Sequence, residues 1–186
     1  MKNKFHEGIC AEGMSKNMIR PMQASDVPRV TEIHVFGWRC AYRGIVSDEH
    51  LFTKMLVSTR LEKTAAWLDT DGNADVSLGE TYVYDDGIVK GFLTIGQCRD
   101  EDKAGVFELG GLYVDPCFKS QGIGRALALY CEEIAVKKGF NEILLWTFEK
   151  NAPTRAFYEK LGYTLDGKTM VVEPLGATGV RYSKRI

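Results

Sequence analysis

The chain has 186 residues, a net charge of −1 and an isoelectric point near 6.3. A chain of this length can bury one full hydrophobic core but is too short for two ordinary domains. Its balanced charge produces no overall field that favours nucleic acid or an anionic membrane, so neither is an expected partner.

The cysteine pattern and the length of the apolar runs indicate where in the cell the protein is expected. The five cysteines are an odd number without a C-x-x-C pair, which argues for reduced thiols and against a disulfide framework or a zinc site. No apolar run approaches the roughly 18 residues that a membrane-spanning helix needs, and the polar N-terminus lacks a signal-peptide core. We therefore expect a cytoplasmic protein.

The first half of the chain predicts a leader followed by short elements. Residues 1–16 show little hydrophobic pattern, so we expect a flexible leader and then a single domain over 17–186. The periodicity then predicts, in order, a strand at 18–22, a helix that starts at Ser25-Asp26, a short helix capped by Ser47-Asp48, and a helical stretch at 56–68. Strands at 81–84 and 88–95 flank Asp85-Asp86-Gly87, which is typical of a hairpin turn.

The second half predicts a crossover unit. A strand at 106–114, an amphipathic helix at 123–138 and a buried strand at 142–148 follow one another, so the two strands should be parallel neighbours. Gly110-Gly111 interrupts the first strand where a bulge is typical. The tail predicts a closing hairpin from 170–173 and 180–183.

The junction between the strand at 106–114 and the next helix contains the sequence KSQGIG, residues 119–124. Gly122 and Gly124 let the backbone approach a ligand, and the first N–H groups of a helix have no partner inside it. Free donors and the helix dipole both attract phosphate, so a pyrophosphate site is predicted here. The loop is neither a Walker motif nor a full G-x-G-x-x-G pattern, and tight strand–helix packing is the alternative reading.

A second motif is NAPTRAFYEKLGY at residues 151–163. Asn151 is the predicted N-cap of a helix, Pro153 fits its first turn, and Gly162 ends it. Tyr158 lies two turns after Asn151, so both side chains fall near one face of the helix.

The two motifs together resemble the GNAT superfamily of acetyl-CoA-dependent N-acetyltransferases. Members pair a strand ending in hydrophobic-Val-Asp-Pro with a (Gln/Arg)-x-x-Gly-x-Gly/Ala loop and a later Asn…Ala…Phe-Tyr-x-x-x-Gly-Phe/Tyr helix. This chain has LYVDP at 112–116 and the loop at 119–124. It matches the helix at Asn151, Ala156, Phe157, Tyr158, Leu161, Gly162 and Tyr163. Lys119 replaces the usual Gln or Arg and retains a cation beside the phosphates.

The resemblance implies an α+β (mixed α/β) fold, in which a twisted mixed sheet of about seven strands carries helices on both faces. The central parallel strands splay apart and admit the pantetheine arm. Acetyl-CoA is the implied co-substrate, without a metal, and its acetyl group passes directly to a primary amine of a small molecule or peptide in a ternary complex. The implied cofactor-binding residues are Leu112, Tyr113, Val114, Lys119, Ser120, Gln121, Gly122, Ile123, Gly124, Arg125 and Asn151.

Two residues are candidates for proton transfer. In the family, a tyrosine at the position of Tyr158 points its hydroxyl at the thioester sulfur and acts as the acid. Several members place a glutamate at the position of Glu108, where it acts as a base through water. A core tyrosine with one hydrogen bond and a solvated carboxylate at the strand edge are the respective alternatives.

Two roles are possible for each of two further groups of residues. Phe36, Trp38 and Tyr42 occupy the region of the acceptor-site helices in this superfamily, and they either line the amine pocket or pack in the core. Arg39 and Arg43 either form a solvated face or select an acidic substrate. A non-catalytic acyl-CoA-binding module and a phosphate- or nucleotide-binding enzyme are alternative functions, and a homodimer is an open alternative for assembly.

Overall fold

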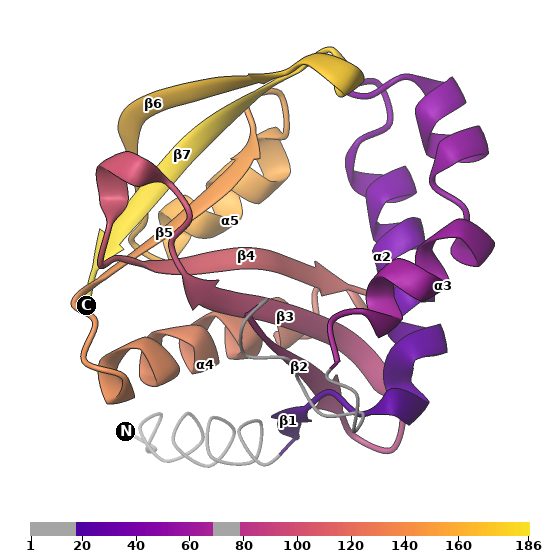
Figure 1. Cartoon of the computed structure of the whole chain (residues 1–186), viewed down its shortest axis with the longest axis horizontal. Coiled ribbons are helices and arrows are strands. Elements are labelled where there is room, and N and C mark those ends of the chain that lie inside the picture. Colours follow the sequence, from indigo (N-terminus) through magenta and orange to yellow (C-terminus); the bar gives the residue numbers. More distant parts are fainter. Residues whose placement is uncertain (1–17, 69–78) are drawn as a thin grey trace, which may run out of the picture.

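The computed structural model describes residues 18–68 and 79–186, and the expected leader at 1–16 lies outside them. The described residues form one seven-stranded sheet in the order β1-β2-β3-β4-β5-β7-β6, with helices on both faces (Figure 1). The strands are β1 (Ile19–Pro21), β2 (Glu80–Asp85), β3 (Val89–Gln97), β4 (Phe107–Val114), β5 (Glu142–Phe148), β6 (Thr164–Val172) and β7 (Ala177–Arg185). The helices are α2 (Val27–Ala41), α3 (Val57–Ala65), α4 (Ile123–Lys137) and α5 (Ala152–Lys160). The predicted fold class is confirmed.

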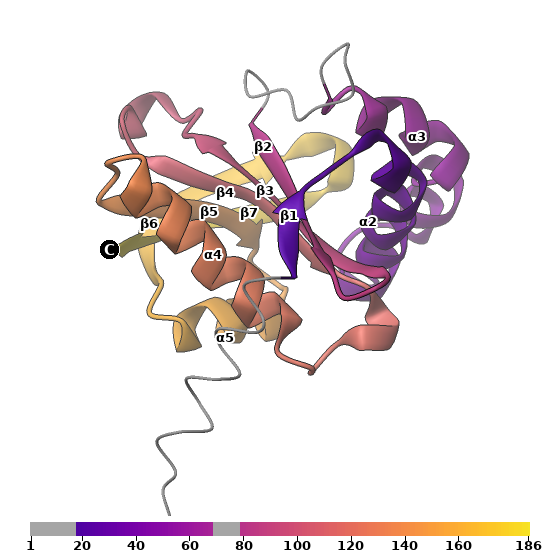
Figure 2. The same cartoon turned by 90° about the horizontal axis from the view of Figure 1, so that it is seen from below.

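Two layers of helix cover the sheet. Helices α4 and α5 lie together on one face, and α2 and α3 lie to the other side (Figure 2). Leu127 and Cys131 of α4 are fully buried in the core on the first face, together with Tyr158 of α5. Ile33 of α2 packs with Phe92 of β3 on the second. Within the described residues, no helix has the length and apolar character needed to cross a membrane.

The pairing of β4 with β5 is the only parallel pairing among the described strands, and it is short. The partners are Phe107 with Ile143, Glu108 with Leu144, and Leu109 with Leu145. Beyond these three pairs the two strands separate.

The separation begins at a bulge in β4. Thr94 of β3 pairs with Gly111 while its neighbour Ile95 pairs with Leu109, so Gly110 is an extra residue in β4. This confirms the predicted bulge. An extra residue bends a strand and increases its twist, which turns the end of β4 away from β5.

Two predicted elements differ from the structure. The helix expected after Ser47 is a five-residue π-type turn at His50–Lys54, with the Ser47 hydroxyl accepting a hydrogen bond from the backbone N–H of His50 at 3.2 Å. The closing hairpin, β6 with β7, is longer than predicted. Strand β6 is an edge strand that is exposed along nearly its whole length, so its sequence carries no alternation to reveal it.

His34 lies in the buried face of α2. Its Nδ1 is 3.1 Å from Nη2 of Arg60, and because a guanidinium only donates, the histidine nitrogen is the acceptor. Burial, together with the positive charge of Arg60, lowers the pKa of His34 to about 3. The ring is therefore neutral at physiological pH.

The burial of His34 predicts that the folded protein loses stability as the pH falls. The pKa is 6.5 for an ordinary histidine and about 3 for His34 in the folded protein. At pH values between these two, the unfolded chain binds a proton that the folded protein does not. The free energy of unfolding should therefore fall by up to about 1.4 kcal/mol per pH unit as the pH drops from 6.5. Carboxylates whose pKa is lowered in the fold, such as Asp26 and Asp115, reduce the free energy of unfolding only below about pH 4.

Urea denaturation of the wild type and His34→Gln at pH 7.5, 6 and 5 measures this effect. Glutamine offers Arg60 an acceptor oxygen but does not titrate, so the variant should lose less stability than the wild type between pH 6.5 and 5. Equal slopes for the two proteins in this range would show that His34 is not the group responsible.

Candidate active site

A cavity of about 470 Å³ occupies the gap between β4 and β5. Its walls come from α2, β4, the loop before α4, β5 and α5. Ten of the eleven residues predicted to bind the cofactor line this cavity, and Gln121 is the exception. Tyr158 also lines it. Motifs that are separate in the sequence therefore meet at one place.

The N-terminus of α4 forms one end of the cavity. Gly122 is its N-cap with φ of 82°, and no side chain caps the helix. Ser120 also has a positive φ, of 63°, which is uncommon outside glycine. The cavity wall here includes Lys119. Uncapped backbone donors, the helix dipole and a lysine suit a phosphate group.

Gly124 brings the backbone close to the opposite wall. A Cβ atom there would lie 3.5 Å from the ring of Phe157 and 3.7 Å from the side chain of Val114. Both distances are ordinary contacts, so alanine fits at this position but a larger side chain would extend into the cavity. The donor set and the space of this end fit the pyrophosphate and pantetheine portions of a coenzyme A thioester.

Helix α5 contributes Asn151 and Tyr158. The side-chain oxygen of Asn151 accepts a hydrogen bond from the backbone N–H of Thr154 at 3.4 Å, which confirms the predicted N-cap. Tyr158 is buried, and burial together with the neighbouring Tyr113 hydroxyl raises the pKa of Tyr158. The phenol of Tyr158 is thus protonated at neutral pH and can donate a proton into the cavity.

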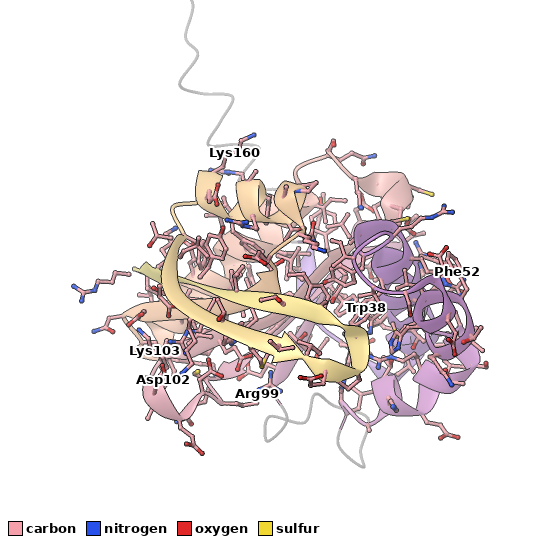
Figure 3. All side chains as sticks on the ribbon, turned by 90° about the horizontal axis from the view of Figure 1, so that it is seen from above. Trp38, Phe52, Arg99, Asp102, Lys103 and Lys160 are labelled. Carbon is pink, nitrogen blue, oxygen red and sulfur yellow. The ribbon has the colours of Figure 1, made fainter. Side chains whose placement is uncertain are left out.

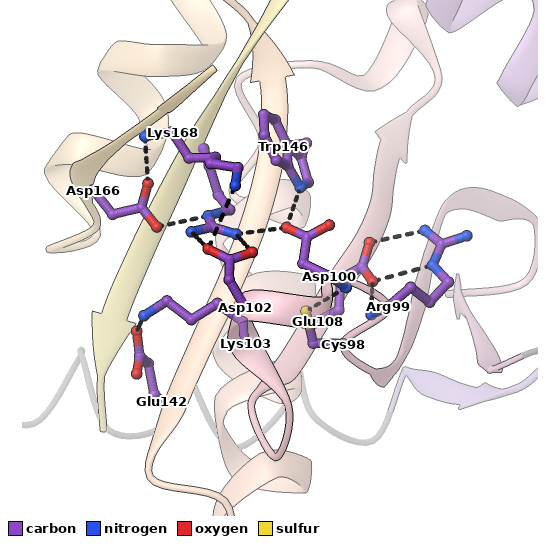
Figure 4. Close-up of polar contacts among 11 residues, drawn as sticks. Cys98, Arg99, Asp100, Asp102, Lys103, Glu108, Glu142, Trp146, Asp166 and Lys168 are labelled. Atoms are coloured by element: carbon purple, nitrogen blue, oxygen red, sulfur yellow. Dashed lines mark hydrogen bonds and ion pairs between the residues drawn. The ribbon is translucent and has the colours of Figure 1, made fainter. Parts of the chain in front are cut away.

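Glu108 lies on β4 within the short parallel pairing and is 7% exposed. Its carboxylate accepts hydrogen bonds from Arg99, at 2.8 Å from Nη2 and 3.2 Å from Nε (Figure 4). It is therefore a buried, paired carboxylate, and the reading of Glu108 as a solvated edge residue is wrong. Glu108 is not among the residues that line the cavity.

Trp146 of β5 lines the cavity, and the sequence motifs did not indicate it. Its Nε1–H donates to Asp100 at 3.0 Å (Figure 4). The guanidinium of Arg181 lies 5.7 Å from the ring centroid of Trp146. Arg181 itself pairs with Asp100, Asp102 and Asp166. The hydrogen bonds from Arg181 lower the pKa of Asp102 to about 2. This network fixes the indole of Trp146 at both its edge and its face.

Helix α2 supplies the wall opposite α5. Tyr42 lines the cavity, as do Gly37 and Ala41. Phe36 does not: it is 42% exposed, and its ring lies 5.9 Å from the guanidinium of Arg39. Of the three aromatic residues predicted either to line a pocket or to pack, Tyr42 therefore contacts the cavity directly. Trp38, which is labelled in Figure 3, is not among the lining residues, and its Nε1–H donates to the hydroxyl of Tyr113 on β4 at 3.0 Å.

The candidate site includes no evident metal centre. Across residues 18–68 and 79–186, no group of three or more His, Cys, Asp and Glu side chains is arranged to hold a metal ion.

Comparisons with known proteins agree with this geometry. The model of the "Acetyltransferase (GNAT) family" matches residues 27–163. The chain is 28% identical over 143 residues to the uncharacterized N-acetyltransferase YuaI of Bacillus subtilis, with 76% of each protein covered. It is 28% identical over 159 residues to the spermidine N(1)-acetyltransferase of Thermoplasma acidophilum, covering 83% of this chain and 94% of that protein.

The fold has solved counterparts as well. The crystal structure of the PaiA N-acetyltransferase of Thermoplasma acidophilum in complex with coenzyme A matches with a TM-score of 0.67 at 22% identity, over 90% of this chain and 98% of that one. The family match extends over most of the sheet and over the residues that form the cavity. The chain therefore belongs to the acetyltransferase (GNAT) family and is an acyltransferase.

Proposed function

We propose that this protein transfers the acetyl group of acetyl-CoA directly to a primary amine of a small molecule or peptide in a ternary complex. The observation that carries this proposal is the cavity, which joins the uncapped N-terminus of α4 to the hydroxyl-bearing wall at Tyr158. Relatives support the choice of acyl donor, since a structural neighbour binds coenzyme A. The chemistry involves no metal, and we place the protein in the cytoplasm.

The reaction needs little more than positioning and two proton transfers. The amine nitrogen attacks the thioester carbonyl carbon, a C–N bond forms, and the C–S bond breaks. In this proposal Tyr158 gives its proton to the departing thiolate. Glu108 lies outside the cavity lining and is paired with Arg99, so in this proposal it takes the proton of the amine through a water molecule and not by direct contact. For a lysine-like amine, loss of that proton at pH 7 costs roughly 4–5 kcal/mol, against about 1 kcal/mol for an α-amino group.

The acceptor in this proposal is a primary amine of a small molecule or a peptide. A related protein carries the name spermidine N(1)-acetyltransferase, and polyamines therefore belong in the first acceptor screen beside amino acids and short peptides. Release of free thiol from acetyl-CoA in the presence of each amine is the direct assay. If the wild-type protein binds acetyl-CoA but none of the tested amines leads to release of thiol, the result would support the non-catalytic alternative.

The first prediction concerns cofactor binding. Gly124→Asp adds bulk and negative charge beside the α4 N-terminus and should abolish measurable binding of acetyl-CoA in calorimetry. Gly124→Ala is the matched control, because its Cβ makes only ordinary contacts, and it should bind within a few-fold of the wild type. Wild-type affinity in a folded Gly124→Asp protein would place the phosphates elsewhere.

The second prediction concerns the acid. Tyr158→Phe keeps the buried ring and removes the hydroxyl, so kcat should fall about 10- to 1,000-fold while acetyl-CoA affinity changes little. The control is Tyr163→Phe, since Tyr163 is buried against Tyr158 and its hydroxyl has no hydrogen-bond partner. Tyr163→Phe should retain wild-type kcat. If Tyr158→Phe did so too, the thiolate would leave without help from this tyrosine.

The third prediction concerns the base. Glu108→Gln should lower kcat/KM about 100-fold near neutral pH, with partial recovery at high pH as the amine loses its proton unaided. An α-amino acceptor should recover at lower pH than a lysine-like one. Glu142→Gln removes another strand carboxylate that pairs with a cation, Lys103, and should leave the pH–rate profile unchanged. An unchanged profile in Glu108→Gln would exclude this glutamate as the base.

A further inference from the structure

The phenol ring of Tyr113 packs closely against α2 and β3. It stacks on Phe92 with ring centroids 5.3 Å apart and lies 4.8 Å from the ring of His34. A Cβ atom on Gly37 would approach Cδ1 of Tyr113 to 3.0 Å, and one on Gly111 would approach Cε2 to 3.4 Å. Glycine inside a helix is disfavoured relative to alanine, and in α2 the glycine at position 37 provides the space for this ring.

The hydroxyl of Tyr113 is positioned as well. Nε1–H of Trp38 donates to it at 3.0 Å, and the hydroxyl oxygen of Tyr42 lies 3.5 Å away. An indole N–H is a donor only, so it occupies one lone pair of the Tyr113 oxygen. If the Tyr113 proton is donated to Tyr42, each of the two oxygens retains one lone pair that can accept a further hydrogen bond.

These two hydroxyls lie on the side of the cavity away from α4. Tyr42 and Tyr113 both line the cavity from the α2 face of the sheet, whereas Tyr158 enters from the face that α4 and α5 cover. All three tyrosines line the same cavity. Burial raises the pKa of each of the three phenols above its ordinary value. All three phenols are therefore protonated at neutral pH.

We infer that the hydroxyl oxygens of Tyr113 and Tyr42 hold the acceptor nitrogen, with Trp38 fixing the position of the Tyr113 hydroxyl. A neutral primary amine has two N–H groups and one lone pair. One N–H donates to each tyrosine oxygen, and the lone pair is directed at the acetyl carbonyl carbon. A secondary amine lacks one of the two donors. The inference rests on the proposed function, because it specifies how that reaction binds its second substrate.

Steady-state kinetics with saturating acetyl-CoA and an acceptor from the thiol-release screen test this inference. Tyr113→Phe removes one hydrogen bond to the amine and should raise the KM of the acceptor about 3- to 10-fold. The affinity for acetyl-CoA should change little, because the cofactor contact expected of Tyr113 is made by its backbone, which the substitution leaves intact. Trp38→Phe should raise the same KM by a smaller factor. In the Tyr113→Phe background, Trp38→Phe should add nothing, because the hydroxyl through which it acts is absent.

Two comparisons sharpen the test. Trp67→Phe alters another indole that packs on His34 and Phe92 and should leave the KM of the acceptor unchanged. The N-methyl derivative of the acceptor should have a higher KM than the primary amine in the wild type. In Tyr113→Phe the KM values of the two amines should differ by a smaller factor.

The outcomes separate this inference from the proposed function. If the wild type acetylates no amine, the proposed function itself fails. If the wild type is active but Tyr113→Phe has the wild-type KM, the inference fails alone. Multiplicative effects of Trp38→Phe and Tyr113→Phe would also overturn it, since they would show that Trp38 acts by packing and not through the Tyr113 hydroxyl.

Discussion

The site depends on the short pairing between β4 and β5. Three parallel residue pairs hold the strands together, and the bulge at Gly110 then turns β4 away. A sheet that continued its pairing would leave no gap for a ligand, because neighbouring strands lie only about 4.8 Å apart. The separation also leaves the β5-facing edge of β4 unpaired beyond Leu109, while residues 112–114 still pair with β3 on the other edge and line the cavity. One extra residue thus creates both the space and the hydrogen-bonding groups of the site.

The same gap connects two faces of the sheet that differ in chemistry. On one face, the N-terminus of α4 and the adjacent Lys119 provide positive potential for phosphates. On the other face, Tyr42 at the end of α2 and Tyr113 of β4 provide neutral hydroxyl groups to the cavity wall, and the indole N–H of Trp38 donates to the Tyr113 hydroxyl. In the proposed reaction the two substrates approach each other from opposite sides, which is the arrangement that direct transfer without a covalent enzyme intermediate requires.

Charged side chains support this wall from outside the cavity. Arg181 is 3% exposed and joins three aspartates from the β3–β4 connection and β6. Arg181 is buried while Asp102 is about half exposed, and a partly buried ion network of this kind is weak evidence for stability, because desolvation of the cation offsets much of the attraction. Its clear effect is geometric: it holds Trp146 in place on the cavity wall.

The sequence by itself determined the elements whose signals are local. The Asp-Gly turn, the glycines before α4, the Asn151 cap and the crossover between two strands each depend on neighbouring residues. The resemblance of the two motifs to a known family then implied the fold class and eleven residues of the cavity wall, which are ten cofactor-binding residues and Tyr158. Only the tertiary structure decided which face each side chain of β4 occupies. Leu109 packs toward α4, and strict alternation would place Tyr113 beside it, but the extra residue at Gly110 moves Tyr113 to the α2 face. A shift of one residue reverses every side chain that follows, and partners such as Arg99 for Glu108 or Asp100 for Trp146 come from other strands and loops that the sequence does not bring together.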